Sequence, residues 1–163
     1  ATLESLVLLN NQIGSDTNAA DGNAGAGVSV YADNATTVAL GMIDSNIIAN
    51  NGGDGLLFDR RNTATIDQIN IANNLIDSNA QTGIEINARN ANNDVNDYVI
   101  SNNEITNSGA DGVLINVEAD AQVNADLFDN RIADNAGFGI HTTESINAQA
   151  DTRYVDEIGR AHV

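Results

Sequence analysis

The chain contains 163 residues, of which 42% are hydrophobic and 4% aromatic, with no Cys and no Pro. That apolar share excludes an intrinsically disordered chain, and the lack of Cys excludes a disulfide framework. Acidic side chains number 23 against 6 basic ones, a formal charge of −17. This balance excludes nucleic acid as a main partner, because phosphate binding requires clustered Lys and Arg.

A repeat of about 28 residues organises the chain. A Gly precedes an alternating apolar run in each unit, at successive steps of 28, 28, 29 and 27 residues: Gly27, Gly55, Gly83, Gly112 and Gly139. An Asn lies nine residues before each of the last four: Asn46, Asn74, Asn103 and Asn130. In the first unit Asn11 and Gly27 are 16 residues apart, which marks an insertion. The periodicity predicts about five stacked coils of 27–29 residues.

Within a unit, apolar residues recur at every second position, which is the period of a β-strand. In the unit 98–125, the first predicted strand covers 98–101, the second contains Ile105, and the third contains Val113 and Ile115. The pair Asn102-Asn103 predicts the first turn, because Asn tolerates the left-handed backbone conformation.

Two more turns complete the predicted coil. Residues 106–111 turn the chain again, and Gly112 then marks a position where we expect a side chain or a negative φ to be excluded. A loop from 116 to about 124 closes the coil and leads into the next unit.

Strands this short cannot bury a face alone, so each must stack on its equivalent in the next coil. Parallel crossovers are right-handed in nearly all sheets, and stacked strands are about 4.8 Å apart. The sequence therefore predicts an all-β fold, a right-handed parallel β-helix. Its predicted core contains Ile71, Ile76, Ile84, Ile86, Ile100, Ile105, Val113, Ile115, Ile132 and Ile140. Its predicted turns carry an asparagine ladder, in which amides bond along the axis: Asn46, Asn74, Asn103 and Asn130.

A leucine-rich repeat is the alternative fold, since apolar residues and an Asn at Ile66-xx-Ile69-x-Ile71-xx-Asn74 also fit that pattern. The second half of the unit favours the β-helix. There a Gly and an alternating run recur every time, whereas a leucine-rich repeat would continue with a helical or extended segment bearing Leu.

Three units carry a family resemblance: IANNLIDSNAQTGIEI, ISNNEITNSGADGVLI and LFDNRIADNAGFGIHT. They resemble the right-handed β-helix repeats of pectate-lyase-like polysaccharide lyases, uronan epimerases and large bacterial surface proteins. The resemblance implies a secreted or cell-surface protein, and it implies the fold more strongly than the activity. The Arg-x-Pro-x-x-Arg, Asn-Thr-Asp, Gly-His-Gly and Asp-Pro-His patterns typical of such enzymes are absent from this sequence.

The two ends suggest that residues 1–156 are one β-helix domain, cut from a longer environmental (metagenomic) open reading frame. Residues 157–163, EIGRAHV, resemble the translation of a common sequencing adapter. We therefore give Arg160 and His162 no functional weight. The sequence shows no signal peptide, and we expect no membrane insertion in this segment.

Candidate binding residues lie on the outward positions of the third strand and in the loop after it. Six residues after the Gly, Arg61 and Arg89 are predicted to stack in adjacent coils. If the chain binds an acidic polysaccharide or surface glycan, we expect that pair to hold it, with the neighbouring Arg60 turned the other way. Residues expected nearby are Asp59, Glu85 and Glu118, with His141 or a carboxylate as a base if there is catalysis. The alternative is a solvated loop whose charges serve solubility.

A calcium ion is the one cofactor considered, because oxygen ligands crowd the first-unit insertion at Asp16, Asn18, Asp21 and Asn23. The alternative is an ordinary polar turn. Two functions remain open at this point. The favoured one is a non-catalytic solenoid in an extracellular or cell-surface bacterial protein. The other is part of a polysaccharide lyase or uronan epimerase.

Overall fold

A computed structural model describes residues 1–15, 21–89, 95–145 and 148–155, which wind into a solenoid of three parallel β-sheets. The first strands of the coils form sheet A: β1 Thr2–Leu3, β2 Leu6–Leu9, β5 Thr37–Asp44, β8 Thr65–Ala72, β11 Val95–Ser101, β14 Gln122–Phe128 and β17 Gln149–Val155. The second strands form sheet B: β3 Gln12–Gly14, β6 Ile47–Ala49, β9 Leu75–Asp77, β12 Glu104–Thr106 and β15 Arg131–Ala133. The third strands form sheet C: β4 Val28–Ala32, β7 Leu56–Arg61, β10 Ile84–Arg89, β13 Val113–Val117 and β16 Ile140–Glu144.

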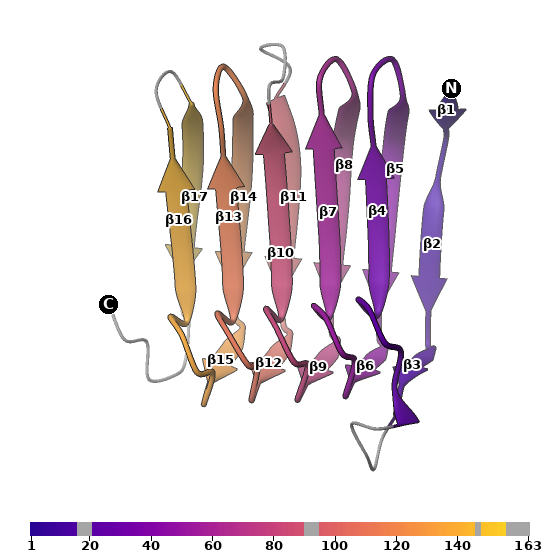
Figure 1. Cartoon of the computed structure of the whole chain (residues 1–163), viewed down its shortest axis with the longest axis vertical. Helices are drawn as coiled ribbons and strands as arrows, with labels where there is room; N and C mark the ends of the chain where they lie inside the picture. Colours follow the sequence, from indigo (N-terminus) through magenta and orange to yellow (C-terminus); the bar gives the residue numbers. More distant parts are fainter. Residues whose placement is uncertain (16–20, 90–94, 146–147, 156–163) are drawn as a thin grey trace.

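The winding is right-handed. In Figure 1 the strands of sheet C run upward in front and those of sheet A run downward behind, while the chain advances from right to left. Sheets B and C each contain five strands in the described part of the chain, so the chain makes about four complete turns from β3 to β15. The predicted parallel β-helix is confirmed. The leucine-rich repeat is wrong, because β4, β7, β10, β13 and β16 occupy the third side of the coils.

The predicted strand limits need one correction. Strand β13 continues to Val117 and β14 already begins at Gln122, so the closing loop is much shorter than the stretch predicted from 116 to about 124. The polar residues in that stretch concealed the strands. Within the strands the polar residues, such as Asn116 and Asn124, alternate with buried apolar residues and point outward.

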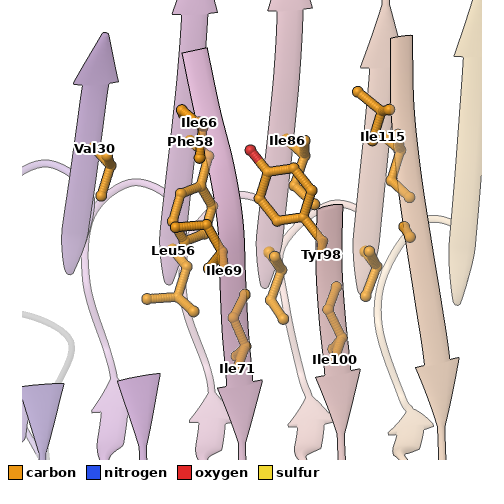
Figure 2. Packing of buried hydrophobic residues seen from close by; sticks show 14 of the residues in the cluster. Val30, Leu56, Phe58, Ile66, Ile69, Ile71, Ile86, Tyr98, Ile100 and Ile115 are labelled. Atoms are coloured by element: carbon orange, nitrogen blue, oxygen red, sulfur yellow. The ribbon is translucent and has the colours of Figure 1, made fainter. Parts of the chain in front are cut away.

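Apolar side chains from all three sheets fill the interior, as predicted. Every predicted core residue is buried except Ile140, which lies on the outermost described strand of sheet C and is partly buried against the cluster. The aromatic rings of Phe58 and Tyr98 meet edge to face inside, with centroids 5.5 Å apart (Figure 2). Arg60 also turns inward, as expected, and its Nη1 donates to the Ala64 carbonyl at 3.2 Å.

The corner between sheets A and B carries the predicted ladder. The residue before each ladder Asn has a positive φ, as at Asn73 and Asn102, which turns the chain sharply. The Oδ1 of Asn103 accepts both the backbone N–H and the Nδ2 of Asn74, at 2.9 Å each. The Nδ2 of Asn103 donates back to the Ile71 carbonyl at 2.9 Å and forward to Asn130 at 3.0 Å. Each buried amide therefore bonds to the coils before and after it.

A second ladder lies at the corner between sheets B and C, and the sequence analysis missed it. It follows the first by five residues, and its Asn51 donates from both the backbone N–H and Nδ2 to Asn79 Oδ1, at 3.1 and 2.9 Å. Further along, the Ser108 N–H donates to Asn135 Oδ1 at 2.9 Å. Ser108 interrupts the row, and its own Oγ is buried without a hydrogen-bond partner.

The repeated Gly serves close approach and not an unusual φ. A Cβ at Gly83 would lie 2.6 Å from the Gly112 carbonyl oxygen and 2.5 Å from the Ile105 side chain. Gly112 itself would meet the Gly139 carbonyl oxygen at 2.6 Å. Its φ is not positive, so the expectation of an excluded negative φ is wrong and that of an excluded side chain is confirmed.

Replacing Asn103 with Ala should lower the free energy of unfolding by about 1–3 kcal/mol, because the Asn74 amide groups lose their acceptor in a buried turn. Thermal and urea unfolding would measure the change. Asn124→Ala, at an exposed position of sheet A, is the control and should cost much less. Equal losses in the two variants would contradict the ladder's role.

Replacing Ser108 with Asn should raise the free energy of unfolding by about 1 kcal/mol, because the new amide continues the row between Asn79 and Asn135. Gly83 leaves room for it, just as Gly55 faces Asn79 and Gly112 faces Asn135. The reverse change, Asn135→Ser, should destabilise the fold. A melting temperature for Ser108→Asn at or below that of the wild type would show that the serine site does not accept the amide.

Candidate functional site

The outer face of sheet C presents three rows of side chains that cross the strands in register. Leu57, Glu85, Leu114 and His141 form the first row, and Asp59, Asn87, Asn116 and Thr143 the second. In the third row Arg61 and Arg89 are paired residues of β7 and β10, as predicted. These rows form a mostly polar surface along the solenoid axis.

The two arginines share one carboxylate. Asp59 Oδ2 accepts hydrogen bonds from Arg61 Nε and Nη2, the latter at 2.6 Å. Asp59 Oδ1 lies 3.9 Å from Arg89 Nε. The Tyr31 ring faces the Arg61 guanidinium, with the ring centroid 5.1 Å from Cζ. Hydrogen bonding to Asp59 and its negative charge raise the pKa of Arg61 further above its usual range. Asp59 therefore binds the edge of the Arg61 guanidinium, and the Tyr31 ring covers one of its faces.

Arg89 is held more loosely. Its contact with Asp59 is long, and its Nε is buried without a hydrogen-bond partner. Its side chain is 33% exposed. Among the described residues, Asp59 thus holds Arg89 less tightly than it holds Arg61.

Glu85 and Glu118 lie on the same face but do not form ion pairs with either arginine among the described residues. Glu85 Oε1 accepts from Asn87 Nδ2 at 2.6 Å, and Glu118 Oε1 accepts from Asn116 Nδ2 at 3.2 Å. Asn116 Nδ2 also reaches Asn87 Oδ1 at 3.4 Å. The amide row thus ties these carboxylates to the sheet and keeps them away from the arginines.

His141 pairs with Asp111 from the preceding coil, with its Nδ1 2.9 Å from Asp111 Oδ2. His141 stands two strands away from Arg89 and four residues earlier in the register. With strand spacing of 4.8 Å and a rise of 3.3 Å per residue, the two positions are about 16 Å apart. The predicted base and the predicted arginine pair therefore do not meet around one bond of a substrate.

A pair of carboxyls that the sequence analysis did not connect lies beside β7. Asp54 is 5% exposed, and its Oδ1 accepts the Thr82 N–H at 2.9 Å. Burial, together with the negative charge of Glu85 and a hydrogen bond with it, raises the pKa of Asp54 to about 6. Asp111 occupies the position of Asp54 two coils later, and there His141 stands in the position of Glu85. A search for residues just before one Gly and two after the next would have found both pairs.

The predicted calcium site is only partly within the described residues. Asp16 and Asn18 lie outside them, whereas Asp21 and Asn23 are described and exposed. Asn23 Nδ2 donates to Asn51 Oδ1 at 3.0 Å, which ties the end of the insertion to the second ladder. Across the described ranges, no group of three or more His, Cys, Asp or Glu side chains is placed to hold a metal ion.

A groove of about 330 Å³ crosses the outer face of sheet A, a face that the sequence analysis did not consider. Its lining residues are Gln68, Asp97, Tyr98, Val99, Asn124, Asp126, Asp151 and Arg153. Arg153 and Asp126 form an ion pair of 2.5 Å across it. The sequence signal for this groove was the polar residues at outward positions of the first strands, such as Asp97 and Asp126.

Comparison of the chain with protein-family models, with curated proteins and with solved structures finds no match. The described residues include no helix that is long and apolar enough to span a membrane.

The Asp54 carboxyl should make stability depend on pH. Because its pKa is raised from 3.8 to about 6 in the folded protein, its stabilising effect is complete below pH 3.8 and is lost as the pH rises through 6. Most of this loss, on the order of 2 kcal/mol, should fall between pH 4 and pH 6. Below pH 4, stability should fall as Asp44 and Asp126 are protonated, because hydrogen bonds from Asn73 and Arg153 lower the pKa of these carboxyls.

Asp54→Asn should remove the loss between pH 4 and pH 6 and leave the protein more stable than the wild type at pH 8, because an amide can still accept from Thr82 without repelling Glu85. Urea unfolding at several pH values would measure this. Asp111→Asn is the matched control and should give no gain, since its neighbour is His141. An unchanged pH profile in Asp54→Asn would show that the Asp54 carboxyl is not the source of the pH dependence.

Proposed function

We propose that the chain is a non-catalytic solenoid segment of an extracellular or cell-surface protein, and that the outer face of sheet C contacts glycans. The main support is the outer face of sheet C, where side chains of successive strands lie in register. Rows of hydroxyl, amide, carboxylate and guanidinium groups repeat along the axis at the strand spacing of about 4.8 Å. A polymer with regularly placed hydroxyl groups finds a donor or an acceptor on each successive coil.

The non-catalytic part of the proposal is supported by the dispersal of the reactive groups. Asp59 neutralises much of the arginine pair, the amide row engages Glu85 and Glu118, and His141 is about 16 Å from Arg89. General acid–base catalysis requires such groups within hydrogen-bond reach of one substrate atom. In the described coils they are spread along the surface.

The choice between the two arginines is testable. When hexagalacturonate is titrated into the protein, its binding should depend mainly on Arg89, because Arg61 is already held by Asp59 and Tyr31. Arg89→Ala should weaken any binding by about tenfold, the loss of one charge-assisted contact. Arg61→Ala should have a smaller effect. Arg131→Ala, at an exposed ion pair on sheet B, is the control and should change nothing.

Calorimetry and amide chemical shifts would report the binding, and neutral hexasaccharides should be titrated alongside. Chromatography of the recovered sugars should show no cleavage and no unsaturated or epimerised product. Absence of binding by every acidic and neutral glycan would contradict glycan contact. Product formation that is lost in His141→Ala or Arg89→Ala would instead favour the lyase or epimerase alternative.

A further inference from the structure

The groove of about 330 Å³ on the outer face of sheet A lies between two rows of outward side chains that follow the solenoid axis. Gln68, Asp97, Asn124 and Asp151 are paired in register along the first row, and Val99, Asp126 and Arg153 along the second. The middle of the groove lies on β11 and β14, and each of these strands is paired with a neighbour on both sides (Figure 1). The groove is therefore open because these side chains point away from the sheet, and not because the stack of coils ends there.

The charged residues of these two rows are concentrated at the groove. On the preceding strands β5 and β8 the same rows carry only uncharged residues: Leu40, Met42, Gln68 and Asn70. From β11 onward the rows carry three carboxylates and one guanidinium: Asp97, Asp126, Asp151 and Arg153. The lining of the groove therefore has two negative charges in excess, and the uncharged rows on β5 and β8 show that the coils fold without them.

The chain itself places one organic cation in the groove. Arg153 Nε donates to Asp126 Oδ1 at 2.7 Å, and its Nη2 donates to Asp126 Oδ2. This is a bidentate contact between a guanidinium and a carboxylate on neighbouring strands. The second row thus has its cation.

The first row has carboxylates without one. Asp97 and Asp151 form no ion pair among the residues that the structure describes. Asn124 lies between them in the row, and its Nδ2 donates to Asp97 Oδ1 at 3.0 Å. Two strand spacings separate Asp97 from Asp151, which is about 10 Å. The row therefore presents two carboxylates at a separation that the sheet fixes.

We propose that this groove binds a linear organic dication, a diamine or polyamine with two ammonium groups about 10 Å apart. One ammonium group would donate to Asp97 and the other to Asp151, which neutralises the two excess charges of the lining. The methylene chain between them would lie beside the partly buried Val99.

The separation of the carboxylates favours an extended cation over a metal ion. A calcium ion needs several oxygens at 2.3–2.6 Å from one point, and two carboxylates about 10 Å apart cannot supply them. The formal charge of −17 draws cations toward the surface in general, and the spacing of the two carboxylates adds the selectivity for length. This inference goes beyond the proposed glycan contact, which concerns the outer face of sheet C.

Three amines should be titrated into the full chain at low salt: heptamethylenediamine, tetramethylenediamine and the monoamine heptylamine. The Asn124 side-chain amide and the Val99 methyl resonances would be followed by NMR. Heptamethylenediamine should shift both sets, with a dissociation constant of about 1 mM, because its extended chain spans the two carboxylates. The other two amines should each bind about fivefold more weakly, since they make one ion pair instead of two.

Asp97→Asn should weaken the binding of heptamethylenediamine about fivefold and remove its advantage over heptylamine. Asp120→Asn is the matched control, because it removes the same charge from an exposed turn outside the groove. The control should leave the advantage of the long diamine unchanged. Circular dichroism of both variants would confirm that the β signal is retained.

The inference is overturned if no amine shifts the two sets of resonances. It is also overturned if the three amines bind equally, which would show only the general attraction of cations to an acidic surface. Equal effects of Asp97→Asn and Asp120→Asn would have the same meaning. Hexagalacturonate binding at Arg89 is measured separately, so a failure in the sheet A groove would leave the proposed function standing.

Discussion

The fold depends on the satisfaction of backbone and amide groups from one coil to the next. Each of the two corners beside sheet B turns on a residue with positive φ, such as Asn102 or Asn107, and the next residue points into the stack. Asn is suited to that inward position because its amide both donates and accepts along the axis. Without these bonds a corner would bury polar groups with no partner, at a cost comparable to that of a lost buried hydrogen bond.

The sequence was sufficient to predict this architecture because each unit has the same signals at the same spacing. Alternation identified the strands, the Gly column fixed the register, and Asn74, Asn103 and Asn130 were correctly assigned to a buried ladder. The second ladder was missed because Ser108 breaks the row of Asn side chains. The lengths of β13 and β14 were missed because polarity was taken as a sign of a loop, although outward positions on one face are free to be polar.

The candidate site was less predictable, for a physical reason. The register placed Arg61 beside Arg89, but side-chain geometry decides which charges they meet, and both turn to Asp59. Glu85 was expected near the arginines and instead pairs with Asn87 and Asp54. Long polar side chains can choose among several partners within one strand spacing, and a repeat pattern does not specify that choice.

The column of Gly also sets how the molecule can change in length. Because Gly83 and Gly112 each sit against the carbonyl oxygen of the next Gly, neighbouring coils fit together by one common contact. A whole coil of about 28 residues could be duplicated or deleted while the ladders and the column rejoin, as in other repeat proteins. Surface features such as Tyr31 and Phe138 would then move apart or together in discrete increments of about 4.8 Å, so the number of coils acts as a ruler for any polymer lying along the axis.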